Sequence, residues 1–125
     1  MNSKAQLINL GSRRLRRLTD ADFYQTLQGS HGPALVIFTS SGCASCRAWK
    51  LILQKYLTEH PDMQVFEVNA QESMALANEY EVFHLPSLFL FKGGHFHCAV
   101  NCEANLEKLH TTIETGLQAP AEEEP

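Results

Sequence analysis

Apolar residues along the chain form short continuous runs separated by segments with helical spacing. The most continuous run is Ala34–Phe38, and further strand-like segments cover 64–69, 86–91 and 95–100. A run of four to eight apolar or β-prone residues bounded by turn residues is typical of a strand in a buried sheet. The pattern therefore predicts four strands, with Lys92-Gly93-Gly94-His95 as a hairpin turn before an edge strand.

Four segments with helical features lie around these strands. They are residues 19–27, the stretch from Cys43 to Pro61, residues 72–80 and residues 105–115. Thr19 followed by Asp22 fits a capping box, which predicts that the first helix begins at Thr19. Gly116 is expected to end the last helix, and the Pro- and Glu-rich residues 117–125 are expected to form an acidic, disordered tail.

The spacing of apolar residues predicts which face each helix buries. In the helix after Cys43 the inner positions are expected to be Ala48, Ile52 and Tyr56, with Trp49, Leu53 and Leu57 beside them. In the segment 72–80 the positions with helix-like spacing are Met74, Ala75, Ala77 and Asn78. In the last helix they are Leu106, Leu109 and Ile113.

The order of these elements indicates an α/β protein. Strands that alternate with helices pair in parallel through right-handed crossovers, and the hairpin adds antiparallel strands at one edge. The 125 residues are enough for one domain with a core. We expect residues 1–12 to be an N-terminal extension, residues 13–116 to be the domain and 117–125 to be the tail.

Composition narrows the function. The formal charge is −4 and 44% of residues are hydrophobic, so neither a broad basic surface for nucleic acid nor a membrane-spanning segment is expected. Basic residues cluster at 13–17, but no apolar segment of a signal peptide follows them. We therefore expect a cytoplasmic protein, in which a C-x-x-C sequence is more often redox-active or metal-binding than a structural staple.

Cys43 and Cys46 form a C-x-x-C sequence between the buried strand and the helix that follows. Three chemistries fit this spacing: half of a zinc site, a structural disulfide, and a dithiol that exchanges electrons with other disulfides. A zinc site needs two more ligands, and the candidates are His95, His97, Cys98 and Cys102. His95, His97 and Cys98 lie on the second strand of the hairpin and Cys102 follows it, and the expected fold places this strand at the far edge of the sheet.

Three stretches of the chain together resemble the thioredoxin family. They are RLTDADF (17–23), ALVIFTSSGCASCRAWK (34–50) and LPSLFLFKGG (85–94), and the resemblance extends over residues 13–116. It implies a thioredoxin fold, in which a central mixed sheet of four to five strands is flanked by about four helices. It also implies that the Leu85–Pro86 peptide bond is cis and faces the cysteines, which leaves the backbone of Leu85 free to pair with a substrate strand.

The resemblance further implies a thiol–disulfide oxidoreductase with Cys43 as the nucleophile and Cys46 as the resolving thiol. A cysteine in such a motif at a helix N-terminus has a pKa of about 3.5–7.5, and thioredoxin is itself one of the examples behind this range. No bound cofactor and no metal are expected. The expected partners are disulfide-containing proteins and a reductase, and the expected state is a monomer.

The active-site sequence departs from the family pattern Trp-Cys-Gly-Pro-Cys. Gly42 replaces the Trp, which removes a flat apolar contact for substrates, and Ala44-Ser45 replaces Gly-Pro. The Ser45 hydroxyl has two alternatives, a hydrogen bond to the Cys43 thiolate or one to the backbone. These departures favour a specialised relative over a general reductant. The alternative function is a partner-specific binding or assembly module with little general reductase activity.

The charged pair that many thioredoxins bury beneath the cysteines is also altered. The family's aspartate falls at Ile37, and its lysine partner falls at Glu67 within a central strand. Glu67 either supplies the proton-transfer acid for Cys46 from the neighbouring strand or reaches an exposed end of the sheet and is solvated. Arg47 and Lys50 flank the cysteines, and we expect them on a solvated helix face; the alternatives are that they help to keep Cys43 ionised or attract acidic partners.

Cys98 and Cys102 lie outside the C-x-x-C sequence. In one regular strand their Cα atoms would be about 13 Å apart, too far for a disulfide, although a loop near Asn101 would bring them closer. We expect plain free cysteines first, a regulatory disulfide second and a metal site last.

Overall fold

A computed structural model describes residues 15–125, and the expected N-terminal extension lies outside the described residues. No helix in this part of the chain is long and apolar enough to cross a membrane. The elements in chain order are β1 (Arg16–Leu18), α2 (Phe23–Gln28), β2 (Pro33–Thr39), α3 (Ala44–Glu59), β3 (Gln64–Asn69), α4 (Met74–Glu79), β4 (Ser87–Lys92), β5 (His95–Val100) and α5 (Leu106–Gln118).

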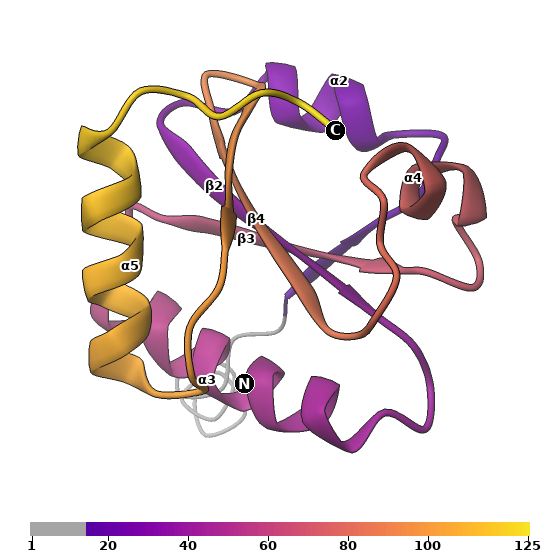
Figure 1. Cartoon of the computed structure of the whole chain (residues 1–125), viewed down its shortest axis with the longest axis horizontal. Coiled ribbons are helices and arrows are strands. Elements are labelled where there is room, and N and C mark those ends of the chain that lie inside the picture. The colour runs from indigo at the N-terminus through magenta and orange to yellow at the C-terminus, as the bar shows by residue number, and fades with distance from the viewer. Residues whose placement is uncertain (1–14) are drawn as a thin grey trace, which may run out of the picture.

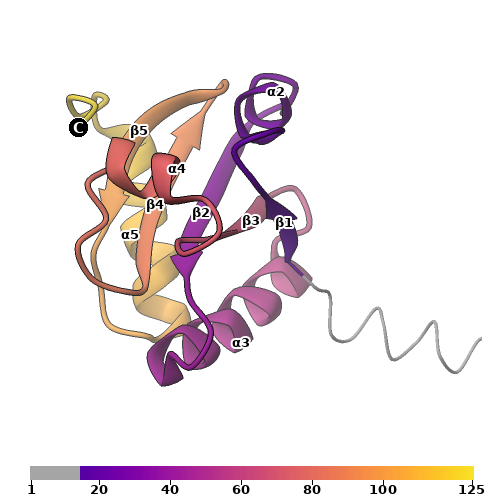
Figure 2. The same cartoon turned by 90° about the vertical axis from the view of Figure 1, so that its right-hand side faces the viewer.

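The five strands form one mixed sheet in the order β1-β3-β2-β4-β5. β1, β3 and β2 are parallel, whereas β4 is antiparallel to β2 and β5 is antiparallel to β4. Helices α2 and α4 cover one face and helices α3 and α5 cover the other (Figures 1 and 2). This arrangement confirms the predicted α/β class, the parallel crossovers and the antiparallel hairpin. At the hairpin turn, Gly93 and Gly94 both have positive φ, as a tight two-residue turn requires.

The strand β1 was absent from the elements predicted by hydrophobic pattern. It has three residues, and Arg16 and Arg17 are exposed while Leu18 is fully buried. A single buried residue gives no periodicity to detect, and β1 exists because it pairs in parallel with β3. The basic cluster therefore contributes two residues to an edge strand of the sheet.

The first helix begins three residues later than the capping box predicts, since its N-cap is Asp22 and not Thr19. Thr19 and Asp22 do interact, since the Thr19 N–H donates to the Asp22 carboxylate over 2.8 Å. The Thr19 hydroxyl, however, accepts from the nearby Ala21 N–H, and residues 20–22 form a turn. The local hydrogen bonds of Thr19 thus stabilise a turn before α2, and the helix itself starts at Phe23.

The buried faces of α3 and α4 differ in part from the predicted ones. Ala48 is exposed, and the buried residues of α3 are Cys46, Trp49, Leu53, Tyr56 and Leu57. In α4 the predicted Met74, Ala75 and Asn78 are exposed, while Leu76 and Ala77 are buried. A six-residue helix has too few turns for its spacing to identify the inner face, and in α4 the contacts with the sheet decide it.

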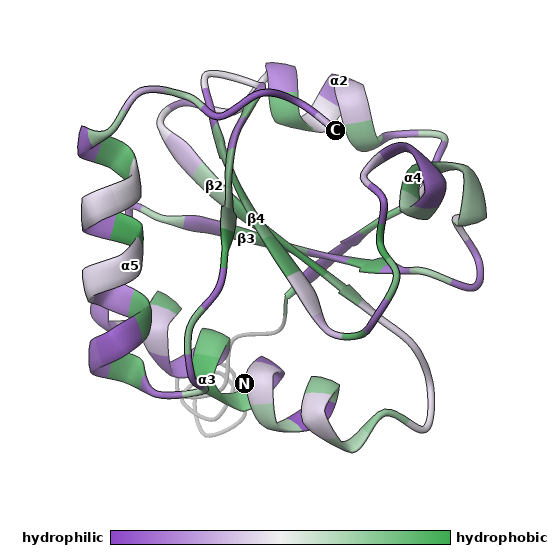
Figure 3. Cartoon of the chain, in the orientation of Figure 1, coloured by the Kyte–Doolittle hydropathy of each residue, from purple (hydrophilic) through white to green (hydrophobic). Residues whose placement is uncertain are grey.

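Two hydrophobic layers sandwich the sheet, and the strands β2 and β4 between them are apolar along most of their length (Figure 3). The layer under α2 and α4 is aromatic and includes Phe23, Phe38, Tyr80, Phe89, Phe91 and Phe96. The layer under α3 and α5 is mainly aliphatic and includes Leu35, Ile37, Leu53, Leu90, Leu109 and Ile113. We call them the aromatic layer and the aliphatic layer.

Gly116 lies inside α5 and does not end it. The helix continues to Gln118, and Gly116 packs closely against β5, where a Cβ atom would come within 3.0 Å of Cys98 Sγ. The Nε2–H of His97 donates to the Gly116 carbonyl over 2.6 Å, which satisfies a carbonyl of the last turn. The glycine is therefore needed because helix and strand approach closely here. In the sequence alone, this role cannot be distinguished from that of a glycine that ends a helix.

The residues after α5 lie along β5 in place of the predicted disordered tail. The Glu122 N–H donates to the His97 carbonyl over 2.7 Å, and the Glu122 carboxylate accepts from the Ala99 N–H over 3.1 Å. β5 is the last strand of the sheet, so its outer backbone groups need partners. Two of these groups make hydrogen bonds with Glu122, which the acidic composition did not indicate.

Candidate active site

Cys43 and Cys46 lie at the start of α3, just beyond the C-terminal end of β2. They form a disulfide with their Cα atoms 5.2 Å apart. Between Thr39 and Cys43 the chain turns through Gly42, which has a φ of 80°. A side chain at Gly42 would have open space but a strained backbone, so the family's Trp is disfavoured here by conformation.

The two cysteines have different surroundings. Cys43 is the N-cap of α3, and its sulfur accepts a hydrogen bond from the Cys46 N–H over 3.1 Å. Unpaired N–H groups and the positive end of the helix dipole favour negative charge at this position. Cys43 is half-buried, whereas Cys46 is 1% exposed. Geometry therefore favours Cys43 as the accessible sulfur that carries charge and Cys46 as the shielded one.

Ser45 is exposed, and its hydroxyl makes no hydrogen bond with any residue in the part of the chain that the structure describes. Neither of the two alternatives for this hydroxyl is present in the disulfide form.

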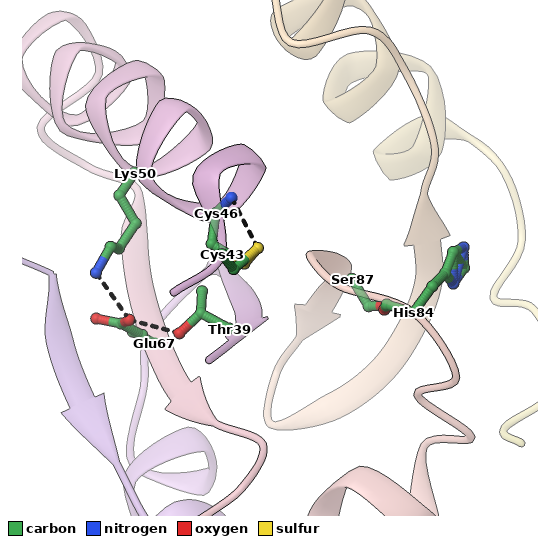
Figure 4. Close-up of a disulfide and its surroundings, with 7 residues drawn as sticks. All are labelled: Thr39, Cys43, Cys46, Lys50, Glu67, His84 and Ser87. Carbon is green, nitrogen blue, oxygen red and sulfur yellow. Dashed lines mark hydrogen bonds and ion pairs between the residues drawn. A yellow bond between two sulfur atoms is a disulfide. The ribbon is translucent and has the colours of Figure 1, made fainter. Parts of the chain in front are cut away.

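The Leu85–Pro86 peptide bond is cis, as the resemblance implies. Ser87, the next residue, pairs with Phe38 near the end of β2, so Pro86 lies at the same end of the sheet as the cysteines. The Ser87 hydroxyl donates to the His84 carbonyl over 2.7 Å, which holds the loop before β4 (Figure 4). The backbone N–H and C=O of Leu85 appear in no hydrogen bond among residues 15–125, so they remain available for a substrate strand.

Glu67 lies buried beneath the start of α3, with 6% of its surface exposed. Its carboxylate oxygen Oε2 accepts from the Thr39 hydroxyl over 2.6 Å and from the Lys50 ammonium over 3.1 Å. Arg17 approaches the same oxygen to 4.0 Å from β1. Figure 4 shows Thr39 on the side of Glu67 that faces the disulfide. Glu67, Thr39 and Lys50 therefore form one polar group in the aliphatic layer.

This geometry decides between the alternatives for Glu67 in part. The alternative of a solvated carboxylate at an exposed end of the sheet is wrong, because the side chain is buried and paired. The expectation of a solvated face for Lys50 is also wrong, since its ammonium reaches inward to Glu67 and the side chain is 33% exposed. Arg47 is exposed, as predicted.

The register explains how the chain keeps a carboxylate in this layer without the family's aspartate. Ile37 on β2 and Glu67 on β3 are direct partners, so their side chains lie on the same face. Thr39 was missed by sequence reasoning because a threonine at a strand end has many ordinary roles. Its position two residues after Ile37, on the same face of the strand, is the signal that could have found it.

The remaining cysteines lie away from the disulfide and are free. Cys98 is buried in β5, where burial and then the nearby Glu122 carboxylate raise the pKa of its thiol. Cys102 is half-buried in the loop after β5. No group of three or more His, Cys, Asp or Glu side chains within residues 15–125 is placed to hold a metal ion.

Comparisons with known proteins identify the family of this chain. The sequence profile of the Thioredoxin family matches residues 14–115. The chain belongs to the thioredoxin family. It is 36% identical over 78 residues to thioredoxin from Alicyclobacillus acidocaldarius, an alignment that covers 62% of this chain and 73% of that protein. It is 28% identical over 78 residues, 62% of this chain and 17% of the other, to a bifunctional thioredoxin reductase/thioredoxin from Mycobacterium leprae.

A solved structure of Fasciola hepatica thioredoxin superimposes with a TM-score of 0.72 and 25% identity, covering 82% of this chain and 99% of the other. The thioredoxin fold is therefore confirmed. As a member of this family the chain is a disulfide oxidoreductase, and the disulfide between Cys43 and Cys46 is consistent with its C-x-x-C sequence.

Proposed function

We propose that this thioredoxin-family protein reduces disulfides in other proteins, with Cys43 as the attacking thiolate and Cys46 as the resolving thiol. The observation that carries the proposal is the asymmetry of the pair. The Cys43 sulfur is the N-cap of α3 and is partly accessible, while Cys46 is buried one turn further in. Only an accessible sulfur can attack a protein disulfide, and a helix N-terminus favours its thiolate.

The exchange proceeds in two steps that balance atoms and electrons. The Cys43 thiolate attacks one sulfur of the substrate disulfide, forming a mixed disulfide and releasing the other substrate sulfur as a thiolate. Cys46, after losing its proton, attacks Cys43 Sγ, which forms the intramolecular disulfide and releases the second substrate sulfur. Two electrons have then moved from the dithiol to the substrate. A reductase supplies two electrons to restore the dithiol, and neither step uses a bound cofactor or metal.

Leu85, Pro86 and Gly42 position the substrate in this proposal. The backbone N–H and C=O of Leu85 make no hydrogen bond among residues 15–125, so they can pair with an extended segment of the substrate. Gly42 places no side chain in front of Cys43. Ser45 lies exposed beside the sulfurs and can hydrogen-bond the thiolate once the disulfide opens.

Glu67 acts in this proposal as the group that takes the proton from Cys46. It is a carboxylate in the layer beneath α3, and Thr39 lies on its disulfide side. The test compares the pH dependence of Cys46 alkylation in the wild type and in Glu67→Gln. We expect a shifted profile, and an unchanged profile would exclude the role. Glu72→Gln is the matched control, since Glu72 also faces Arg17 but is exposed.

The test of the function is the reduction of insulin disulfides with a supply of reductant. We expect turnover that is lost in Cys43→Ser and retained in Cys102→Ser, the matched removal of a free thiol elsewhere. In Cys46→Ser we expect the mixed disulfide on Cys43 to accumulate, detectable by mass spectrometry. Absence of turnover despite a reversible Cys43–Cys46 bridge would instead favour the partner-specific module. We further propose a monomer in the cytoplasm, where a reductase keeps dithiols reduced.

A further inference from the structure

Cys98 is a thiol that the proposed exchange does not use, and its surroundings differ from those of Cys43. Cys98 lies in β5, is 7% exposed and forms no disulfide. Cys43 is the N-cap of α3, where the helix favours a thiolate. Burial and then the charge of Glu122 raise the pKa of the Cys98 thiol, so a smaller fraction of it is the reactive thiolate. The fold thus favours reaction at one sulfur and disfavours it at another.

A cavity of about 340 Å³ lies beside Cys98, and three parts of the chain line it. β5 contributes Cys98 and Ala99, α5 contributes Thr111, Thr112, Thr115 and Gly116, and the segment after α5 contributes Ala119, Pro120 and Glu122. We call residues 119–122 the C-terminal strap. Figure 1 shows this segment leaving the end of α5 and crossing β5. The strap therefore forms one wall of the cavity.

The other two walls are fixed by the core. Leu109 and Ile113 of α5 are fully buried in the aliphatic layer, and β5 pairs with β4 along its length. On the helix side the Cys98 sulfur packs so closely that a Cβ atom at Gly116 would come within 3.0 Å of it. Movement of α5 or β5 would break these contacts, so the strap is the wall that opens at the lowest cost.

Glu122 holds the C-terminal strap on β5. Its N–H donates to the His97 carbonyl over 2.7 Å, and its carboxylate accepts from the Ala99 N–H over 3.1 Å. His97 and Ala99 flank Cys98, so the strap is bonded on both sides of the thiol. Within residues 15–125, these are the hydrogen bonds that residues 120–122 make, and all three residues are exposed. A segment held in this way opens more readily than a helix or strand packed in the core.

We propose that the C-terminal strap is a displaceable cover that keeps the Cys98 thiol out of thiol–disulfide exchange. While the strap is in place, a disulfide cannot approach the sulfur, which prevents unproductive mixed disulfides in a protein that works among disulfides. When the strap leaves β5, Cys98 loses its proton to solvent and its thiolate attacks a disulfide. A mixed disulfide forms on Cys98, and the other sulfur leaves as a thiolate. The inference goes beyond the proposed function, because it concerns a sulfur that the Cys43–Cys46 exchange does not use.

The test measures the rate at which Cys98 reacts with the aromatic disulfide DTNB. In the oxidised protein Cys43 and Cys46 are joined, so the free thiols are Cys98 and Cys102. Cys102→Ser leaves Cys98 as the single free thiol. We expect this protein to react at least about a hundredfold more slowly than the same protein unfolded in guanidinium chloride, as for a sulfur that is accessible only in a minor open state.

The decisive variants, made in the Cys102→Ser protein, are Glu122→Pro and Glu122→Ala. Glu122→Pro removes both hydrogen bonds to β5, and Glu122→Ala removes only the one made by the carboxylate. We expect the rate to rise about fiftyfold and about tenfold, respectively, as the loss of two bonds or one would give. Glu123→Pro and Glu123→Ala are the matched controls, since Glu123 is exposed and makes no hydrogen bond among residues 15–125. Both controls should react at the rate of Cys102→Ser.

Two further measurements separate opening of the strap from other causes. Glu122→Gln keeps an oxygen that can accept from the Ala99 N–H but removes the charge, so we expect a smaller rise than in Glu122→Ala. An equal rise would assign the effect to charge and overturn the inference. In Cys102→Ser the rate should not change with guanidinium chloride below the unfolding transition, because opening of a short strap exposes little surface.

Three other results would also overturn the inference. They are a rate that rises with denaturant in proportion to global unfolding, reaction of the folded Cys102→Ser protein at the unfolded rate, and equal rates in Glu122→Pro and Glu123→Pro. None of these results depends on the reduction of disulfides by Cys43. The proposed function would therefore stand if the inference failed, and its own failure would leave the inference to be decided by these rates.

Discussion

The two faces of the sheet differ in what their side chains can do. In the aromatic layer, rings pack edge to face, for example Phe23 against Phe91 with centroids 5.8 Å apart. In the aliphatic layer, a buried carboxylate with two close partners interrupts the apolar contacts below the first turn of α3. Edge-to-face ring packing contributes stability, whereas a buried carboxylate lowers stability unless it is paired. If Glu67 takes the proton from Cys46 as proposed above, the domain separates stability and chemistry on opposite faces of the same strands.

The largest expected effect comes from the aromatic layer. Phe91→Ala should lower the free energy of unfolding by about 3–5 kcal/mol, because a fully packed ring is replaced by a cavity. Denaturant unfolding measures the loss. The rate at which the folded variant reduces bis(2-hydroxyethyl) disulfide should remain that of the wild type. A slower rate would show that the aromatic layer also supports the chemistry and would break the comparison.

Substitution of Thr39 is expected to lower stability less than Phe91→Ala does, and also to change the reactivity of Cys46. Thr39→Val keeps the shape but removes the hydrogen bond to the buried Glu67 carboxylate, so the free energy of unfolding should fall by about 1.5–3 kcal/mol. The pH profile of Cys46 alkylation should shift as well. Thr58→Val is the control, since that exposed hydroxyl bonds only the Gln54 carbonyl. If Thr39→Val loses stability but the pH profile of Cys46 alkylation does not shift, the role of Thr39 is structural only.

Substitution of Gly116 tests how tightly the aliphatic layer is packed at a place far from the dithiol. Ala normally stabilises a helix interior by about 1 kcal/mol relative to Gly, but here its Cβ would meet Cys98 Sγ at 3.0 Å. We therefore expect Gly116→Ala to destabilise by about 1 kcal/mol, within the range for overpacking. Adding Cys98→Ala should reverse the sign of the glycine substitution, and denaturant unfolding of all four proteins completes the cycle. Stabilisation by Gly116→Ala alone would disprove the close-packing role.

The smallest effect is expected at Tyr80 and appears only at alkaline pH. Burial, followed by the charge of Glu79, raises the pKa of this phenol above its ordinary value of 10.0. The stability linked to the neutral phenol is present below pH 10 and is lost as the pH rises above that value, because the unfolded chain ionises first. Tyr80→Phe should flatten the alkaline fall in melting temperature and change little at pH 7. An equally steep fall in the variant would contradict this linkage.

The elements that the sequence predicts correctly are those whose residue pattern is long enough, or specific enough, to be recognised locally. The run Ala34–Phe38 and the turn Gly93-Gly94 specify their elements locally, so β2 and the hairpin were predicted correctly. The hydrophobic pattern did not predict β1 or identify the inner face of α4, because each has too few residues for a period and depends on pairing or packing with the sheet. Gly116 was misread because close packing and helix termination both select glycine.

The candidate site likewise contains residues that local sequence motifs predict and residues that only the tertiary structure brings together. Cys43, Cys46 and the cis bond at Pro86 follow from local motifs and the family resemblance. The partners of Glu67 do not, since Thr39 and Lys50 reach it from two other elements.

The contact between Glu122 and β5 has a consequence for anyone who builds with this domain. The segment after α5 cannot be replaced freely, because Glu122 makes hydrogen bonds with the outer backbone groups of His97 and Ala99 on the edge strand. A fusion partner or affinity tag joined directly after Gln118 would remove that cover and leave an unpaired edge that recruits other strands. Residues 119–125 should therefore be kept whenever the domain is expressed with a tag or a fusion partner.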